Sequence, residues 1–406
     1  MNRQPREILH RFHFPRHLHV TTSPLQFADP TERSGRSAES PFPVNQLDAS
    51  VLSLDALSPA ELDRWESIRG EREDFRSPFF SVAFSKAVQR ARGDVSVAVI
   101  CRGGSIVAFL PFHRIGRRGY PVGRFFNDAH NLIAPANERI TWSWLLNEIG
   151  LKTYEFHALA GSDPDEFPHH TCHETIRSFR CEIGDDSRGY LERLGRQHKT
   201  IGRQGQKTRK MAREVGPVQL ELDCRSREAL QQNIQLKRDQ YARTHILDLF
   251  QPDWTNRLME ELFDRPDSDR GEARGILSVL RAGDQIVASH YGILEHGLLH
   301  YWFPAYDPQY RRYSPGTGLF CSLVKNASAH GIWCVDMGYG EQSYKPKQTD
   351  ATGSVAKGCI ADSRVYRQFR CVETRVVNAA KKLPAKEPLK RVWRTIWPSA
   401  GISKLT

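Results

Sequence analysis

The sequence predicts an α/β (α+β) protein in which two mixed sheets, each flanked by helices, form two domains. Three observations support this prediction. The 406 residues exceed what a single core normally organises, so two cores are expected. Strand-like runs alternate along the chain with segments of helical periodicity. Apolar residues make up 39% and charged residues 26% of the chain, the composition of a soluble globular protein rather than a disordered one.

Composition and motif signals divide the chain into four segments. Residues 1–45 are rich in Pro, Arg, His and Ser without a sustained period, which predicts a disordered extension. Residues 46–185 and 186–362 carry the strand and helix signals and form the two predicted domains. Residues 363–406 form a basic tail, in which Leu389–Trp397 interleaves apolar residues with cations and suits an anionic membrane surface. A terminal helix docked on the body with its cations outward is the alternative for this tail.

Three features predict a cytoplasmic protein, with the basic tail as a contact to the inner face of the membrane. No apolar run approaches the length that spans a bilayer, and Met1–Val20 lacks the apolar core of a secretory signal. The eight cysteines are scattered without a CxxC pair, which argues against disulfides and structural zinc. Histidines in the extension and within Gly161–His173 lack regular ligand spacing, so we expect no metal site.

The first domain begins with a helix signal and continues with a strand hairpin. Ser58 precedes a first-turn proline, the combination typical of a helix start. Val95–Arg102 and Ile106–His113 are β-rich runs separated by two glycines, which predicts a hairpin. Asn127–Asn131, with the loop-borne His130, stands where a glycine-rich loop would be expected. We therefore interpret this domain as a diverged and degenerate repeat of the second, either structural or forming one wall of a cleft.

The second domain has the clearest order of elements. Gly275–Arg281 and Gln285–Leu294 are strand-like runs joined by a turn, and the aromatic run Leu298–Ala305 follows after a second turn. A loop rich in glycine, proline and arginine comes next. Apolar residues then recur at helical spacing over Leu319–Ala327, and a last strand is expected at Ile332–Asp336. The plan is a three-strand meander, a basic loop, a helix and a parallel strand.

The loop before the predicted helix has the composition of an anion-binding helix start. Free N–H groups and the positive end of the helix dipole bind anions there, and small residues let a phosphate approach the backbone. Arginines add charge-assisted hydrogen bonds. The candidate phosphate-binding residues are Arg311, Arg312, Ser314, Gly316, Thr317 and Gly318. An ordinary helix start with exposed arginines is the alternative.

Arg188–Val215 is a second unusual stretch, with a thin apolar seam surrounded by cations. It predicts a basic helix that binds RNA, lipid headgroups or cofactor phosphates, or that is simply a solvated face. Aromatic side chains that stack on single-stranded bases are absent after Tyr190. Gly202 and Gly205 each weaken a helix by roughly 1 kcal/mol relative to Ala, so contacts beyond helix propensity are expected to hold it.

Several residues of the second domain together resemble known acyltransferases. Arg311-x-x-Ser314-x-Gly316 fits the Arg/Gln-x-x-Gly-x-Gly/Ala loop of GNAT acyltransferases if Ser314 replaces the first glycine. Further motifs resemble the CelD-type acetyltransferase-like family, which is linked to cellulose and exopolysaccharide synthesis and related to FemAB-like tandem GNAT proteins. They are Pro304-Ala305-Tyr306-Asp307, Ser314-Pro315-Gly316, Asp336, Gly338, Tyr344-Lys345 and Leu236-Lys237-x-x-Gln240-Tyr241. The resemblance spans roughly Phe75 to Ile360 and implies a tandem GNAT fold.

This resemblance implies an acyltransferase that moves an acetyl or other acyl group from acyl-CoA to an amine or hydroxyl. The loop amides would hold the coenzyme A pyrophosphate, with acyl-CoA (acetyl-CoA) as co-substrate and no metal. The basic helix would flank the donor or an anionic acceptor. The expected acceptor is a small molecule or a glycan, in polysaccharide or cell-envelope biosynthesis.

Transfer from a thioester requires placement of the acceptor, polarisation of the carbonyl and removal of a proton. In GNAT proteins a backbone amide beside a bulge of the fourth strand usually polarises the carbonyl, here within the aromatic run. Asp336, at the C-terminal end of a strand, is the first candidate base, with His290 and His300 as others. Tyr344 is a candidate acid for the departing thiolate, and Lys345 a ligand for an anionic acceptor or donor phosphate. The alternatives are a turn cap for Asp336 and hydrogen-bonded core positions for the histidines.

Two other functions stay open. The net charge of +11 attracts anions such as nucleic acid, and a Fem-type aminoacyl-tRNA-dependent transferase would use the basic helix for its donor. We rank tRNA below acyl-CoA as a partner. The second alternative is a non-catalytic scaffold of an envelope-polysaccharide assembly with degenerate GNAT halves, which the replacement of glycine by Ser314 leaves open.

Overall fold

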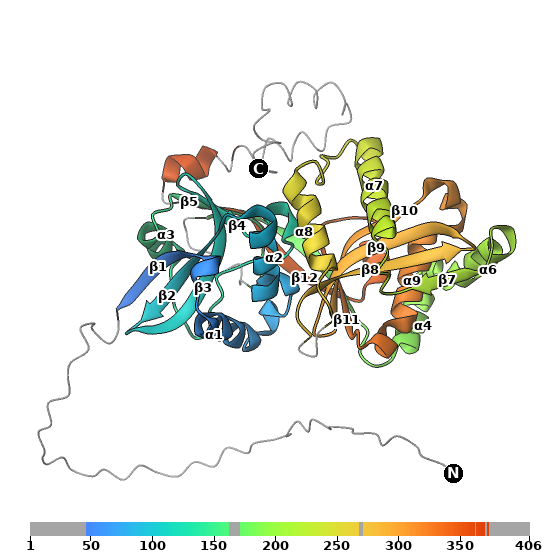
Figure 1. Ribbon diagram of the computed structural model, residues 1–406, viewed down its shortest axis with the longest axis horizontal. Coiled ribbons are helices and arrows are strands. Elements are labelled where there is room, and N and C mark those ends of the chain that lie inside the picture. The colour runs from blue at the N-terminus through green and yellow to red at the C-terminus, as the bar shows by residue number, and fades with distance from the viewer. Residues whose placement is uncertain (1–45, 162–170, 268–270, 362, 370–371, 373–406) are drawn as a thin grey trace, which may run out of the picture. The chain divides into compact units, whose positions relative to one another are not determined.

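The computed structural model describes residues 46–161, 171–267, 271–361, 363–369 and 372 (Figure 1). The predicted extension, most of the basic tail and most of the histidine-containing loop lie outside these residues. None of the described helices combines the length and the apolar character that crossing a bilayer requires.

The described residues of the first half, 46–185, form six strands and three α-helices. Ser58 caps the first helix reciprocally with Glu61, and Ser81 caps the second, which ends at Gly93 in the left-handed conformation. The predicted hairpin around the two glycines is present. The elements are β1 (Leu47–Ser53), α1 (Pro59–Gly70), α2 (Val82–Arg92), β2 (Val95–Arg102), β3 (Ser105–Ile115), β4 (Arg118–Pro121), α3 (Trp142–Glu148), β5 (Thr153–Leu159) and β6 (Thr171–Glu182).

The second half contains the predicted meander, the helix after it and the parallel strand. Its elements are α4 (Ser187–Gln197), α5 (Lys199–Gly202), α6 (Gln204–Glu214), β7 (Val218–Glu221), α7 (Arg227–Thr244), α8 (Asp253–Phe263), β8 (Arg274–Ala282), β9 (Gln285–Glu295), β10 (Leu298–Tyr306), α9 (Pro315–Ala327), β11 (Cys334–Tyr339), α10 (Lys345–Gln348) and β12 (Ala351–Ala361). Helices α7 and α8 contribute to an apolar cluster on one face of these strands, and α4 and α9 to another (Figure 1).

The prediction of one basic helix over Arg188–Val215 is wrong, because three short helices occupy this stretch. His198 has an extended backbone and separates α4 from α5. Gly195 and Gly202 lie in contact there, and a Cβ at Gly202 would fall 2.7 Å from the Gly195 carbonyl oxygen. The glycines thus serve the close approach of two short helices rather than weakening one long one.

The prediction of two separate sheets is also wrong, because all twelve described strands form one mixed sheet. Its order is β1-β2-β3-β4-β5-β12-β6-β11-β10-β9-β8-β7. The join is made by β6 and β12, which pair with each other over most of their length. In addition, β12 pairs with β5 of the first half, while β6 pairs with β11 of the second. The last strand of each half therefore pairs with the fifth strand of the other half: β6 with β11, and β12 with β5.

An aromatic core joins the same two halves. Phe126, from the first half, packs against Phe250, Trp254 and Trp302 of the second with ring centroids 5.4–5.8 Å apart. All four rings belong to one apolar cluster that continues to α1 and α2. The two predicted domains consequently share a core as well as a sheet.

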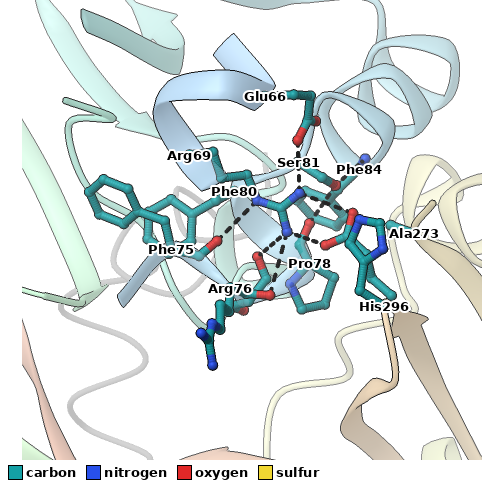
Figure 2. Close-up of polar contacts among 12 residues, drawn as sticks. Glu66, Arg69, Phe75, Arg76, Pro78, Phe80, Ser81, Phe84, Ala273 and His296 are labelled. Carbon is teal, nitrogen blue, oxygen red and sulfur yellow. Dashed lines mark hydrogen bonds and ion pairs between the residues drawn. The ribbon is translucent and has the colours of Figure 1, made fainter. Parts of the chain in front are cut away.

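A buried ion pair connects α1 to the end of β9. Figure 2 shows the Arg69 guanidinium enclosed by oxygen acceptors. It donates to both carboxylate oxygens of Glu295, to the Phe75 carbonyl at 3.0 Å, to the Ser77 carbonyl at 3.3 Å and to Glu66 at 2.9 Å. Arg69 is 6% and Glu295 3% exposed. Because every guanidinium nitrogen is bonded, the charge is buried with full compensation.

Candidate active site

The strands β10 and β11 separate in the middle of the second half. They pair in parallel only where Leu298–His300 faces Cys334–Asp336. Directly afterwards the register of β10 on β9 shifts between His300 and Phe303, which marks a β-bulge at Tyr301 and Trp302. The bulge expected in the aromatic run is therefore present at the point where β10 leaves its neighbour.

Side chains of α7 reach the edge of β10 beyond the bulge. Asn233 donates to the Phe303 carbonyl at 3.2 Å, and the Lys237 ammonium donates to the Pro304 carbonyl at 3.3 Å. Lys237 is buried, and this burial lowers its pKa to about 8. Sequence reasoning placed Lys237 in a family motif but assigned it no role.

The predicted phosphate loop adopts the geometry of a helix start. Ser314 has φ +53 and precedes α9, whose first residue, Pro315, has no N–H to leave unpaired. The N–H groups of Gly316 and Thr317 lie in the first turn, where no helical acceptor precedes them. A Cβ added at Gly316 would meet only Tyr306, at 3.6 Å, so space remains above this turn. The loop can therefore present free donors to an anion.

Cations surround this helix start. The Lys207 ammonium donates to the Ser314 hydroxyl at 2.7 Å, which brings the basic stretch to the loop. Arg312 pairs with Glu214 at 3.3 Å, and the exposed side chain of Arg311 makes no hydrogen bond to another described residue. The α6 helix is held there by Gln204, whose amide donates to the Tyr313 carbonyl at 3.1 Å.

A polar cluster lies where β10 and β11 separate. The Asp336 carboxylate accepts from the Gly338 N–H at 2.7 Å and from Arg180 at 3.4 Å. Its Oδ1 lies 4.0 Å from the His300 Nδ1. On the other side of the ring, His300 Nε2 donates to Asp128 Oδ2 at 3.0 Å. The structure thus joins Asp336 and His300, predicted from the second half, to Asp128, a first-half residue that sequence analysis did not select.

The pKa directions describe the charge state of this cluster. Burial by itself raises the pKa of Asp128, but the hydrogen bond and charge of His300 outweigh it and lower that pKa below its ordinary value. Burial lowers the pKa of Lys345, opposed by Asp128 and Asp336. Burial, followed by the charge of Asp128, raises the pKa of Tyr344 to about 12. At neutral pH Asp128 is therefore an anion and Tyr344 a neutral phenol.

Tyr344 and Lys345 lie at the start of α10, close to this cluster. The Tyr344 side chain remains 36% exposed. Lys345 is buried and its ammonium donates to the Tyr339 carbonyl at 2.6 Å. Lys345 thus fixes the end of β11 in this structure, while Tyr344 has the access that a proton donor needs.

His290 does not join the cluster. It is fully buried on β9 and stacks on Tyr301 with ring centroids 3.9 Å apart. No hydrogen bond or ion pair links it to Asp128, His300 or Asp336 in the described chain. Burial, followed by the nearby charge of His300, lowers the pKa of His290 well below the ordinary value, and both ring nitrogens lack hydrogen-bond partners among the described residues. A catalytic role for His290 stays a prediction without a supporting contact.

The corresponding place in the first half is filled by its own chain. There β4 pairs in parallel with β5 only at Arg118 and Gly119. Beyond these residues His130 bridges to β5, since its N–H donates to the Ala158 carbonyl at 3.0 Å. Ile133 exchanges backbone hydrogen bonds with Phe109 of β3. Sequence analysis noted the missing loop here, but nothing in the sequence indicated that the replacing segment reaches β10.

Comparisons with known proteins agree with this geometry. Residues 198–346 match the model of an acetyltransferase (GNAT) domain. No protein with a curated description matches the sequence. Among solved structures, FemX superposes with a TM-score of 0.51 and 10% identity, covering 79% of this chain and 99% of that one. At this identity the likeness concerns the fold alone, which is the α+β fold of GNAT proteins.

Two looser structural matches have TM-scores below 0.5. The C-terminal domain of a putative lysylphosphatidylglycerol synthetase from Agrobacterium fabrum gives 0.47 with 14% identity, over 79% of this chain and 97% of that one. A tandem GNAT protein from the clavulanic acid biosynthesis pathway gives 0.44 with 11% identity, over 78% and 99%. The fold assignment rests on FemX and the GNAT domain match, and the narrower CelD-type resemblance stays a prediction.

Proposed function

We propose, from the GNAT acetyltransferase match of residues 198–346, that this protein transfers an acyl group from acyl-CoA to an amine or hydroxyl acceptor. The observation that carries the proposal is the separation of β10 from β11 at the bulge, with the loop before α9 at the far end of the opened strand. A thioester beside the bulge and its phosphates at the helix start fit this arrangement.

The residues around the helix start fit the phosphates of the donor. The first-turn amides of Gly316 and Thr317 supply uncharged donors, and Arg311 and Lys207 supply positive charge. Ser314 replaces the first glycine of the family motif, and its left-handed backbone supplies the conformation for which glycine is usually chosen. This geometry favours a binding-competent loop over a degenerate scaffold.

The chemistry needs little covalent machinery, because a thioester is already activated. The acceptor atom attacks the carbonyl carbon, the C–S bond breaks, and the sulfur leaves as a thiolate that takes up a proton. Tyr344 suits the donation of that proton, since it is partly exposed and neutral at physiological pH. Asp336 stays a candidate base, although its two hydrogen bonds also give it a structural role.

The acceptor and the cellular setting rest on the CelD-type resemblance. It favours a small molecule or glycan in polysaccharide or cell-envelope biosynthesis, and the basic tail remains a proposed contact to the inner face of the membrane. A Fem-type aminoacyl-tRNA-dependent transferase is the second candidate. It is favoured by the cations of α4–α6 that flank the donor loop, and it predicts tRNA binding that weakens steeply with salt.

Calorimetric titration of acetyl-CoA and longer acyl-CoAs into the full chain tests the proposal. We expect saturable binding to the wild type and affinity about tenfold or more weaker in Arg311→Ala/Arg312→Ala, because hydrogen bonds to charged groups are lost. Arg139→Ala, which removes an exposed arginine of the first half, is the control and should bind like the wild type. No binding of any acyl-CoA to folded wild-type protein would refute the proposal and direct the same titration to tRNA.

A further inference from the structure

The last helix of the described chain exposes an apolar face. Residues 364–369 and Val372 are helical, and the Ser363 hydroxyl caps this helix by accepting a backbone N–H at 3.2 Å. Val365, Phe369 and Val372 are 76%, 51% and 56% exposed. Positions three and four apart lie on the same side of a helix, so these three side chains form one apolar face toward solvent.

The rest of this helix is anchored to the sheet. The Tyr366 hydroxyl donates to the Glu155 carboxylate of β5 at 2.9 Å, and the Arg367 side chain donates to the Ala361 carbonyl of β12 at 2.7 Å. The Arg118 guanidinium lies 5.8 Å from the centre of the Tyr366 ring. Figure 1 shows the helix in orange-red beside β5. Because these contacts fix the helix on the sheet, the apolar face is held outward.

The turn between β3 and β4 adds an exposed apolar residue and cations beside the helix. Ile115 is 42% exposed and pairs across the hairpin with Arg118, whose guanidinium contacts the helix. Arg117 and Lys152 are exposed, and the Lys152 N–H donates to the Arg117 carbonyl at 2.8 Å. We call the exposed side of the helix, together with residues 114–118 and Lys152, the helix–turn surface.

Positive charge is concentrated in the segment that begins with this helix. Residues 363–406 contain 11 of the 58 Lys and Arg residues but only 2 of the 47 Asp and Glu residues. They therefore carry a net charge of +9, out of +11 for the whole chain. In the sequence, Val376 and Leu383 continue the spacing of the apolar residues past Val372. Basic and apolar character thus persist together beyond the described helix.

An anionic lipid bilayer is the partner that matches both properties. Apolar side chains of a basic helix insert at the boundary between headgroups and acyl chains, while the cations attract lipid phosphates. A second copy of this chain would bring two strongly positive segments together, which Coulomb repulsion opposes. Nucleic acid would use the cations, but it stacks on aromatic rings and gains little from Val365, Val372 and Ile115.

We propose that the helix–turn surface docks on an anionic lipid bilayer. The apolar face of the helix and Ile115 insert, and the cations of the turn and Lys152 face the headgroup phosphates. This surface belongs to the described chain and is separate from Leu389–Trp397, so it gives the first half a role of its own. The inference goes beyond the proposed function, since docking requires neither acyl-CoA nor an acceptor.

Sedimentation of the full chain with vesicles tests the inference. The probes are vesicles of phosphatidylcholine alone and vesicles of equal parts phosphatidylcholine and phosphatidylglycerol. We expect binding to the anionic vesicles that weakens with salt, and little binding to the neutral ones. Val365→Ser/Phe369→Ser should lower the partition coefficient about tenfold or more, because apolar contacts with the acyl chains are lost. Arg117→Gln/Lys152→Gln should lower it about tenfold or more through the lost charge.

Matched controls remove the same kinds of side chain elsewhere. Val51→Ser removes an exposed apolar residue of β1, and Arg243→Gln removes an exposed cation of α7, so both should bind like the wild type. Every variant keeps the residues after Val372, so a loss of binding reports on the helix–turn surface. Thermal unfolding checks that each variant folds. The two double variants lie on different elements, so one still tests the inference if the other does not fold.

Three results with vesicles would each overturn the inference: no binding to the anionic vesicles, equal binding to both kinds, or wild-type binding by both double variants. Binding of tRNA without binding of vesicles, lost in the double variants, would overturn it in favour of nucleic acid. Self-association with the same pattern, measured by light scattering, would overturn it in favour of a second copy. Failure to bind acetyl-CoA would refute the proposed function and leave this inference standing.

Discussion

At the scale of single residues, Gly338 fixes how closely the two halves approach in the candidate site. Its φ is +66, and an added Cβ would lie 2.8 Å from Asp128 Oδ2 and 3.2 Å from His300 Cε1. Gly331 has the same φ of +66 with nothing within 4 Å of its Cβ position. We expect Gly331→Ala to cost about 1–2 kcal/mol of unfolding free energy through backbone strain alone.

The difference between these two variants isolates the contact with Asp128. Gly338→Ala should cost about 2 kcal/mol more than Gly331→Ala, because overpacking adds to the same strain. It should also displace Asp128 and reduce acetyl transfer, while Gly331→Ala leaves transfer intact. Chemical denaturation and thiol release measure both quantities. Equal losses of unfolding free energy in Gly338→Ala and Gly331→Ala would show that the segment carrying Asp128 moves aside without an energetic cost.

Lys237 gives the candidate site a measurable pH dependence. Burial lowers its pKa from 10.5 to about 8, so between these values the unfolded chain binds a proton that the folded chain has lost. The free energy of unfolding therefore rises with pH across this window, by about 3 kcal/mol from this group. The difference in unfolding free energy between wild type and Lys237→Met should follow that rise from pH 8 to 10.5. Lys325→Met, at an exposed lysine of α9, is the control for charge removal. A flat difference for Lys237 would contradict the prediction.

Sequence reasoning at this scale reached residues that have a recognisable local pattern. The helix start near Ser314 and the strand-end Asp336 carry such patterns, because their chemistry depends on neighbours in the chain. Asp128 carries none, because its partner His300 is 172 positions away. A pairing of that kind depends on the sheet that joins the halves, which no short motif encodes.

At the scale of elements, the basic stretch depends on two glycines with opposite surroundings. A Cβ at Gly202 would fall 2.7 Å from the Gly195 carbonyl oxygen, whereas a Cβ at Gly205 would meet only the end of the flexible Arg209 side chain, at 3.5 Å. Both substitutions to alanine gain helix propensity, worth up to about 1 kcal/mol. We expect Gly205→Ala to stabilise the protein and Gly202→Ala to destabilise it, as thermal unfolding would report. Stabilisation by both would mean that the contact between α4 and α5 has no energetic weight.

The elements themselves were predictable where the signals were local. The capped helix at Ser58, the hairpin at the paired glycines and the meander over β8, β9 and β10 follow from capping, turn and alternation rules. The division of the basic stretch at His198 was not, since it depends on packing between two short helices. The exchange of β6 and β12 was also missed, because strand partners far apart in sequence leave no periodic signal.

At the scale of the whole molecule, the exchanged strands make the two halves one cooperative body. β12 adds the sixth strand to the sheet of the first half, and β6 adds the sixth strand to the sheet of the second. Neither predicted domain therefore has all of its sheet without a strand from the other. The aromatic core around Phe126 reinforces the same junction. The first half has no open cleft of its own, because its own chain fills the corresponding place. It nevertheless contributes to the candidate site of the second half, because the coupling holds Asp128 against His300 of β10.

The ion pair between Arg69 and Glu295 tests how strongly this junction depends on buried charge. Both side chains are nearly inaccessible, and Glu295→Gln would leave the buried Arg69 guanidinium with Glu66 as its remaining carboxylate partner among the described residues (Figure 2). Removing one partner of a buried ion pair costs about 3–5 kcal/mol, and we expect about 3 kcal/mol here because Glu66 still offsets part of the Arg69 charge. Arg90 and Glu261 form a second ion pair between the halves, but they are 45% and 36% exposed. Glu261→Gln should therefore cost about 1 kcal/mol or less. Unfolding free energies from chemical denaturation measure both losses. Similar losses in the two variants would contradict the prediction and mean that Glu66 or water compensates the Arg69 charge when Glu295 is neutralised.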